Sequence, residues 1–125
     1  MKYLLDTHIL LWAAGDALPP VAKKYFSEEN VLCFSPASLW EIVIKRALNR
    51  NDFQIDPPAF HKGLLAAGYQ EIAITTKHAL ALESLPPIHK DPFDRILLAQ
   101  ATAVNIDLLT TDTYLSKYPA HVRMI

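Results

Sequence analysis

Four acidic residues stand at the edges or inside of apolar segments that are far apart in the sequence. Asp6 ends the first apolar run, Glu41 lies inside an apolar helical pattern, Asp94 opens another such pattern, and Asp112 follows a strand-like run. Removing a lone carboxylate from water is costly unless the group is paired or bound to a metal ion. Four such carboxylates therefore predict a site for a hard divalent cation, and a site of that kind indicates phosphate chemistry.

Each of these carboxylates also has an ordinary structural explanation. Asp6 is placed to cap the helix that follows it, and Asp94 lies in a first helical turn, where the helix dipole favours a negative charge. Glu41 has Lys45 four residues later, a spacing that suits an ion pair on a helix. Asp112 is placed to cap a short helix over residues 113–117. The case for a metal site rests on one fold bringing all four together.

Three further residues are expected to support the acids. Thr7 offers a hydroxyl beside the first acid, and Thr110 or Thr111 offers one just before the last, placed to orient a ligand carboxylate. Asp91 is predicted to cap the helix whose first turn holds Asp94. The two negative charges at that helix start repel each other, and a bound cation relieves the repulsion.

Apolar patterns and turn residues predict the elements that position these acids. Short continuous apolar runs indicate buried strands, and a Ser or Asp cap followed by Pro indicates a helix start. Strands are predicted at 3–5, 31–34, 71–74, 106–110 and 122–124, and helices at 8–14, 20–26 and 36–48, from 57 to a closing Gly68, from 76 to before Pro86, and from 92 through 101. This alternation predicts an α/β fold with one parallel sheet, whose site lies beyond the carboxyl ends of the strands.

The composition indicates one compact globular domain over residues 1–125. The chain is 51% hydrophobic and 20% charged, with a net charge of -1, which excludes a generally basic nucleic-acid-binding fold but allows a metal-dependent nuclease. The one cysteine, Cys33, lies in an apolar run and is expected in the core, which fits a reducing compartment. No apolar run is long enough to span a membrane, so a soluble cytoplasmic protein is expected.

Five short motifs follow one another along nearly the whole chain. They are LLDTH at 4–8, SLWEI at 38–42, HKDPFDR at 89–95, LAQA at 98–101 and LTTD at 109–112. In residue type, spacing and order they resemble the PIN-domain ribonucleases, and specifically the VapC-type toxins of type II toxin–antitoxin pairs. The DPFDR stretch with its following AQA is specific to one branch of that family.

The resemblance implies a PIN-like three-layer α/β/α sandwich around a central parallel sheet of about five strands. By motif match, Asp6, Glu41, Asp94 and Asp112 are the catalytic quartet that binds Mg²⁺ or Mn²⁺. The resemblance also implies endonucleolytic cleavage of RNA, inhibition by a partner antitoxin, and a homodimer.

Further residues are predicted to contact the substrate or the partner. One or two metal ions would activate a water for in-line attack on phosphorus, and neighbouring cations would hold the RNA backbone. Neither His8 nor His89 is required as a base, and surface or capping roles are favoured for both. The predicted RNA contacts are Lys45, Arg46, Arg50, Lys90 and Arg95. A groove for an amphipathic antitoxin helix is predicted at Leu11, Trp12, Val21, Tyr25 and Phe26, with ordinary core packing as the alternative.

Three rival interpretations predict different residues or different behaviour. A phosphate-receiver domain needs paired acids near the first strand, but Asp6 stands alone there. A haloacid-type phosphatase needs a second aspartate at the position that His8 occupies. A non-catalytic protein-interaction module of PIN-like fold keeps the acids as helix caps, binds no metal at them, and remains the alternative function.

Overall fold

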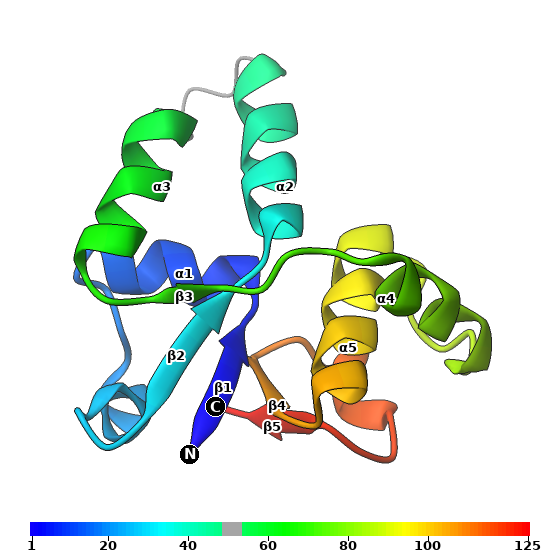
Figure 1. The fold of residues 1–125 in the computed structure, drawn as a ribbon. Coiled ribbons are helices and arrows are strands. Elements are labelled where there is room, and N and C mark those ends of the chain that lie inside the picture. Colours follow the sequence, from blue (N-terminus) through cyan, green and yellow to red (C-terminus); the bar gives the residue numbers. More distant parts are fainter. Residues whose placement is uncertain (49–53) are drawn as a thin grey trace.

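A five-stranded parallel sheet forms the centre of the computed structural model, which describes residues 1–48 and 54–125 (Figure 1). The strands lie in the order β3-β2-β1-β4-β5, so β1 is central and β5 is at an edge, as predicted. The chain adds β2 and β3 on one side of β1, and β4 and β5 on the other. Such a switch point is where parallel sheets place their sites. The strands are β1 (Lys2–Leu5), β2 (Val31–Phe34), β3 (Gln70–Glu71), β4 (Asp107–Thr110) and β5 (Val122–Met124).

The central strands are buried on both faces. Tyr3 and Leu5 belong to the core on one face of the sheet, and Leu4 between them belongs to the core on the other. This alternation follows from the geometry of a strand, in which successive side chains point to opposite faces. Cys33 is fully buried in the second of these cores, as predicted for a small core residue.

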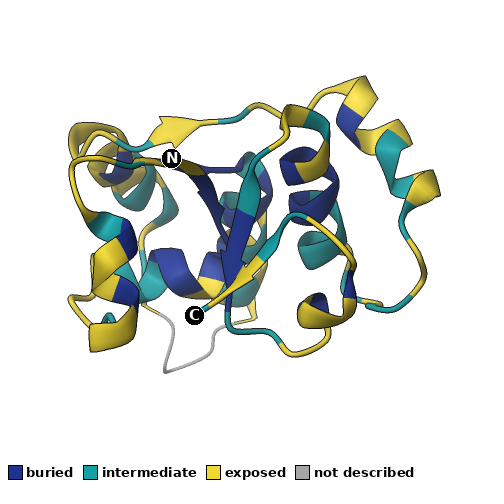
Figure 2. Ribbon diagram, turned by 90° about the horizontal axis from the view of Figure 1, so that it is seen from below, coloured by how far each residue is buried: buried dark blue, intermediate teal, exposed yellow. Residues whose placement is uncertain are grey.

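Helices cover both faces of the sheet and produce three layers. The first core packs against α1, η1 and α3, and the second packs against α5 and η3, with α4 against α5. Burial is accordingly concentrated in the three inner strands β1, β2 and β4 and on the inner helix surfaces, while the edge strands are largely exposed (Figure 2). The predicted three-layer α/β/α sandwich is confirmed. The helices are α1 (Thr7–Ala14), α2 (Pro36–Ala47), α3 (Pro57–Ala66), α4 (Thr76–Ala81) and α5 (Pro92–Val104), and the 3₁₀ helices are η1 (Pro20–Phe26), η2 (Leu82–Ser84) and η3 (Leu115–Lys117).

Three helices begin where the capping residues predicted, whereas the helix predicted from residue 76 to before Pro86 is divided into α4 and η2, and α5 continues past residue 101 to Val104. The side chain of Asp6 accepts from the backbone of α1, Ser35 caps α2, and Asp91 caps α5. Pro36 and Pro92 occupy the first helical positions behind their caps, where the missing N–H is not needed. None of the helices in the described ranges is long and apolar enough to cross a membrane.

The third strand is shorter than predicted, at residues 70–71 instead of 71–74. It pairs only with the end of β2, and the last bond runs from the Ile72 N–H to the Phe34 oxygen. Beyond Phe34 the chain turns into α2, so residues after Ile72 have no strand beside them. The Ile72 carbonyl instead accepts from the buried Gln100 side chain at 2.9 Å, which ties this segment to α5.

Candidate metal centre

Asp6 is the most constrained of the four acids. It follows β1 directly, and its backbone N–H continues the sheet by donating to the Leu109 oxygen at 3.1 Å. One carboxylate oxygen accepts from the Ile9 N–H of α1 at 2.8 Å, and the other accepts from the Thr110 hydroxyl. Burial raises the pKa of Asp6 above 3.8, although both of these hydrogen bonds act to lower it. The side chain is therefore a fixed, buried carboxylate at the end of the central strand.

Thr110 joins two of the acids. Its hydroxyl donates to Asp6 and accepts from the Asp112 N–H at 3.0 Å. This confirms that a hydroxyl near the end of β4 orients a carboxylate, and it shows that the oriented group is Asp6. Thr7 donates its hydroxyl to Ser38 of α2 at 2.9 Å, so it holds α1 against α2.

Asp94 lies in the first turn of α5, where Asp91 caps the helix. The Asp91 carboxylate accepts from the N–H groups of Phe93 and Asp94, at 2.8 and 3.2 Å, which confirms its predicted role as the cap. Burial, followed by the negative charges of Asp91, Asp112 and Asp6, raises the pKa of Asp94 from 3.8 to about 7, against the lowering effect of His89. A divalent cation near Asp94 would relieve this crowding of negative charge.

Asp112 follows β4 and also acts as a cap. Its carboxylate accepts from the N–H groups of Tyr114 and Leu115, at 2.8 and 3.2 Å, at the start of the turn that leads into η3. Burial acts to raise the pKa of Asp112, but the hydrogen bonds from His89, Leu115 and Tyr114 outweigh it and lower the pKa. Asp112 is thus ionised more readily than Asp94.

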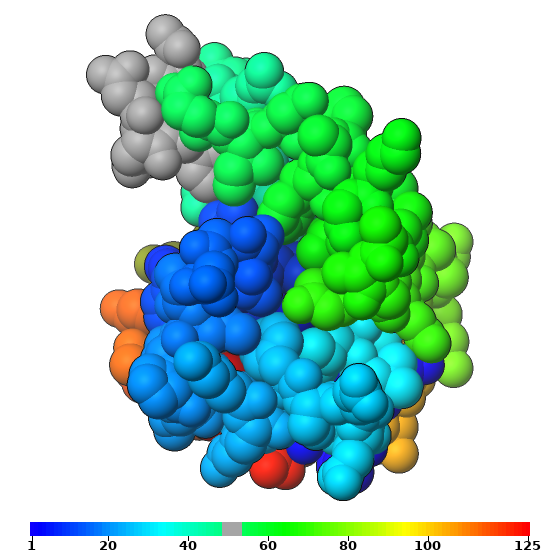
Figure 3. Space-filling model, turned by 90° about the vertical axis from the view of Figure 1, so that its left-hand side faces the viewer, coloured from blue at the N-terminus to red at the C-terminus, as the bar shows by residue number. Residues whose placement is uncertain are grey.

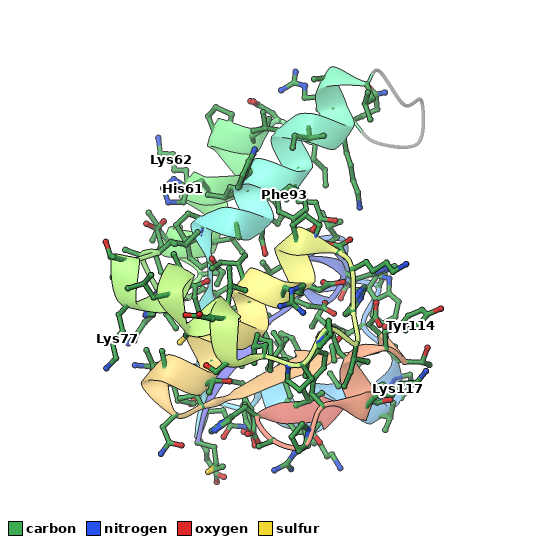
Figure 4. The ribbon with its side chains drawn as sticks, turned by 90° about the vertical axis from the view of Figure 1, so that its right-hand side faces the viewer. His61, Lys62, Lys77, Phe93, Tyr114 and Lys117 are labelled. Atoms are coloured by element: carbon green, nitrogen blue, oxygen red, sulfur yellow. The ribbon has the colours of Figure 1, made fainter. Side chains whose placement is uncertain are left out.

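Glu41 lies on α2, which rises from the carboxyl end of β2. Its side chain is 16% exposed and pairs with Lys45 one turn later at 3.2 Å, so the predicted half-buried position and the predicted ion pair are both confirmed. Trp40, which directly precedes Glu41 on α2, stacks edge-on against Phe93 of α5 with ring centroids 5.1 Å apart. Figure 4 shows Phe93 at the end of α5 nearest α2. This aromatic contact fixes how far α2 stands from Asp94.

The four acids line one cavity of about 420 Å³ at the carboxyl edge of the sheet. Four separate parts of the chain contribute, namely the end of β1, α2, α5 and the loop after β4. The cavity also has Thr7, His8, Leu11, Lys45 and Thr111 in its wall. Carboxylate oxygens are the ligands that Mg²⁺ and Mn²⁺ prefer, and the charges here repel one another in the absence of a cation. The residues present therefore fit a divalent ion.

His89 enters this site although the sequence interpretation treated it as a bystander. Its Nε2 lies 2.9 Å from an Asp94 oxygen and 3.1 Å from an Asp112 oxygen. Its Nδ1 accepts from the Asp91 N–H at 3.1 Å. Within the described residues, the group of His and acidic side chains that could hold one metal ion is His89, Asp94 and Asp112, whose ligand atoms all lie within 4.8 Å of one another. The sequence signal for this role was weak: a histidine two residues before a helix cap.

The predicted RNA-contacting cations are not equivalent in the structure. Lys45 stands in the cavity wall, and the exposed Arg46 pairs with Asp56 at 3.2 Å. Lys90 is exposed on the loop before α5. Arg95 donates to the carbonyl oxygens of residues 82, 86 and 89 and to the Tyr118 hydroxyl, so its guanidinium holds that loop. Arg50 lies outside the described residues.

The residues predicted to form an antitoxin groove differ in how far they are exposed. Tyr25 is 8% exposed and packs edge-on against Tyr3, so it belongs to the core. Leu11, Trp12 and Phe26 are half-buried, and Val21 is exposed. A cavity of about 350 Å³ lies between α1 and α3, on the face shown in Figure 3. Its wall is formed by small or apolar residues, namely Ala13, Ala14, Ala59, Phe60, Gly63, Leu64, Ala67 and Tyr69.

Residues 3–120 match the PIN domain family. The chain belongs to the PIN domain family. Comparison with curated protein sequences gave no match. The match spans every element from β1 to η3, and it confirms the family that the five sequence motifs predicted.

Solved structures share the complete fold of this PIN domain. VapBC2 from Rickettsia felis, bound to a DNA fragment from its promoter, has a TM-score of 0.74 and 16% identity, covering 99% of this chain and 98% of that chain. DNA-bound VapBC from Salmonella typhimurium has a TM-score of 0.69 and 13% identity, covering 100% and 97%. VapBC-1 from nontypeable Haemophilus influenzae has a TM-score of 0.64 and 16% identity, covering 100% and 97%. At these identities, the likeness concerns the fold.

Proposed function

We propose that residues 1–125 form one nuclease domain, a metal-dependent endoribonuclease that hydrolyses RNA phosphodiester bonds and acts in the cytoplasm. The observation that carries this proposal is the convergence of Asp6, Glu41, Asp94 and Asp112 in one cavity from four distant segments. Structural needs alone do not explain that convergence, because caps and ion pairs form locally and do not have to meet. Burial, followed by repulsion from neighbouring carboxylates, raises the pKa of Asp94, and a bound cation would relieve that repulsion.

The four carboxylates would hold Mg²⁺ or Mn²⁺. A divalent ion bound there supplies a water of lowered pKa and neutralises charge on the scissile phosphate. The protein side chains would hold the ligand carboxylates in place. Two hydrogen bonds leave the Asp6 carboxylate little freedom, and the ion pair with Lys45 holds Glu41 at the cavity. Fixed ligands of this kind hold substrate and ion together without reorganising during the reaction.

The RNA backbone would approach the cavity from its open side. Lys45 is in the cavity wall, and Lys90 is exposed on the loop that also carries His89. We assign these two lysines the most direct phosphate contacts among the predicted cations. Arg46 would contribute from the outer turn of α2, and Arg50 follows it along the chain. Arg95 would act chiefly by holding the loop, because its donors already serve carbonyl oxygens.

We further propose that the protein is a VapC-type toxin that is inhibited by a partner antitoxin and forms a homodimer. Two observations support this assignment. The family match spans nearly the whole chain, and the structures that share its fold include VapBC complexes and a toxin–antitoxin complex from Klebsiella pneumoniae. The predicted antitoxin groove stays part of the proposal, with Val21, Leu11, Trp12 and Phe26 as its accessible residues and Tyr25 beneath them.

Cleavage of a structured RNA pool by the purified protein tests the nuclease assignment. The reactions would contain Mg²⁺ or Mn²⁺. Two further reactions, one with EDTA added and one with the Asp6→Asn variant, would test whether cutting needs the metal and the carboxylate. Asparagine still caps a helix, so Asp6→Asn should retain α1. Asp16→Asn is the matched control, because Asp16 is exposed, lies outside the cavity and has a positive φ of 53° that asparagine also tolerates.

The expected result is cutting that requires the metal, is lost in Asp6→Asn and is retained in Asp16→Asn. Cutting that persists in EDTA or in Asp6→Asn would overturn the carboxylate–metal mechanism. An intact RNA pool, together with no calorimetric signal for either metal, would replace the nuclease by the non-catalytic interaction module.

A further inference from the structure

We propose that His89 is a positioning residue of the metal centre, whose Nε2–H donates to Asp94 and Asp112 together and holds these two carboxylates in place for the ion. The inference rests on the metal site of the proposed function and gives that site a supporting residue outside the quartet. In this role the imidazole does not bind the ion, and the protein offers the ion oxygen ligands from the carboxylates.

One ring nitrogen lies within hydrogen-bonding distance of both acids. Nε2 of His89 is 2.9 Å from Asp94 Oδ2 and 3.1 Å from Asp112 Oδ2. Asp94 lies in the first turn of α5 and Asp112 follows β4, so this nitrogen joins two segments that are distant in the sequence. The side chains of His89 and Asp94 are only 12% and 19% exposed, and a hydrogen bond shielded from water is electrostatically stronger.

The neighbouring backbone makes Nε2 a donor. The Asp91 N–H can only donate, so Nδ1 of His89 accepts from it, at 3.1 Å. In the neutral ring the one hydrogen therefore sits on Nε2, and in the charged ring Nε2 carries a hydrogen as well. A nitrogen that carries a hydrogen has no lone pair for a metal ion. His89 is thus a donor to the acids and not a ligand, although Nε2 lies in one cluster with the ligand oxygens of Asp94 and Asp112.

A shared donor offsets the repulsion between the two acids. Ligand oxygens of Asp94 and Asp112 lie within 4.8 Å of each other, a separation at which two ionised carboxylates repel. The Nε2–H group contacts the Oδ2 atom of each and attracts both. A carboxylate has about four acceptor sites, so one hydrogen bond leaves others for an ion. His89 therefore keeps two ligands close together before the ion arrives, which lowers the cost of binding it.

The ring is itself held by its backbone and by an aromatic neighbour. The His89 N–H donates to the Tyr118 hydroxyl at 3.1 Å, and the His89 carbonyl accepts from Arg95 at 3.4 Å. The imidazole packs against the Tyr114 ring with centroids 5.4 Å apart, and the Tyr114 N–H donates to Asp112 Oδ1 at 2.8 Å. A donor fixed in this way directs its hydrogen at the two acceptors without reorganising when the ion binds.

Two substitutions separate the two nitrogens of the ring. In His89→Asn the amide oxygen can take the place of Nδ1 and accept from the Asp91 N–H, but no donor reaches the acids. In His89→Gln the longer side chain brings its amide N–H to the place of Nε2, and the Asp91 N–H loses its acceptor. His61→Asn is the matched control, because His61 also contacts a carboxylate, that of Glu71 at 2.7 Å, but lies on α3 outside the cavity (Figure 4).

The measurements use metal binding and a spectroscopic signature, both independent of RNA cleavage. Titration calorimetry of the full chain with Mg²⁺ or Mn²⁺ alone should show both affinities falling in parallel in His89→Asn, by about 10–100-fold. His89→Gln and His61→Asn should lower them by less than about tenfold. Nitrogen-15 spectra of the Mg²⁺-loaded wild type should show that Nε2 of His89 still carries its hydrogen.

Equal losses in His89→Asn and His89→Gln, or a larger loss in His89→Gln, would overturn the inference, because His89 would then act through the Asp91 N–H. An Nε2 that loses its hydrogen when Mg²⁺ binds would overturn it as well, and this result does not depend on either variant folding. Metal-dependent RNA cleavage by the wild type is compatible with both results, so they are distinct from failure of the proposed nuclease. Absence of metal binding by the wild type would remove the proposed centre and this inference together.

Discussion

Replacing Asp94 by asparagine should make the metal-free protein more stable at neutral pH. Burial and the charges of Asp91, Asp112 and Asp6 raise the pKa of Asp94 from 3.8 to about 7. A folded-state pKa above the unfolded value means that the folded protein binds more protons between these two pH values. Stability therefore falls as pH rises from about 4 to 7, and the loss is complete above that range. The asparagine side chain does not ionise in this pH range, so the unfolding free energy of the variant does not decrease for this reason as pH rises.

The size of the effect follows from the pKa. An interval of about 3 between folded and unfolded pKa corresponds to about 4 kcal/mol. The Asp94 side chain is 19% exposed, and solvent screening reduces the expected gain to about 2 kcal/mol. The hydrogen bond to His89 survives the substitution, because the amide oxygen accepts from Nε2–H as the carboxylate does.

Urea denaturation in EDTA at about pH 5 and about pH 8 would measure this difference in unfolding free energy. Wild type should lose more stability than Asp94→Asn between the two conditions. Adding Mn²⁺ at about 100 times its Kd should then stabilise wild type by about 2.7 kcal/mol and the variant by much less. A variant that is equally or less stable than wild type at the higher pH would refute the account of crowded negative charge.

Three further predictions concern residues that support the site. Thr110→Val should lower the unfolding free energy by about 1–3 kcal/mol, because Asp6 loses a buried donor; Thr110→Ser should not, and equal midpoints for both in urea would contradict this. Arg95→Lys should speed amide hydrogen exchange in residues 85–91, because lysine cannot donate to several carbonyl oxygens at once. Unchanged exchange rates would show that Arg95 does not stabilise this loop. Tyr25→Ala should cost about 3–5 kcal/mol and Val21→Ala less than about 0.5 kcal/mol, since only the first is buried; similar losses by calorimetry would mean that Tyr25 is a surface residue.

The parts of the fold that follow from local chemistry could be predicted from the sequence. Ser35 before Pro36, and Asp91 before Pro92, each mark a helix start, because a side-chain acceptor and a missing N–H both suit that position. Gly68 has a φ of 90° just past α3, as expected for a residue that ends a helix in the left-handed region. The convergence of the acids was predictable because parallel strands end at one edge of their sheet.

The parts that depend on distant partners could not be predicted in this way. The length of β3 is limited by the position at which β2 ends, and the sequence of residues 71–74 gives no indication of that position. His89 lies in a loop without apolar periodicity, and Arg95 lies beside that loop. Their contacts are with Tyr118 and, for His89, with acids from other segments of the chain. Tyr25 has a composition that suits either a groove or a core, and only the position of Tyr3 decides between them.

The order in which the acids occur along the chain has a consequence for synthesis. Asp6 is translated near the start, but β4, which pairs with β1 and carries Thr110, comes near the end. At roughly 5–20 residues per second, the ribosome needs roughly 5–20 s to pass from one to the other. During that interval the nascent chain has no complete cavity. The cavity is therefore completed only late in synthesis, and any chain released before residue 107 lacks both the last acid and the strand that orients the first.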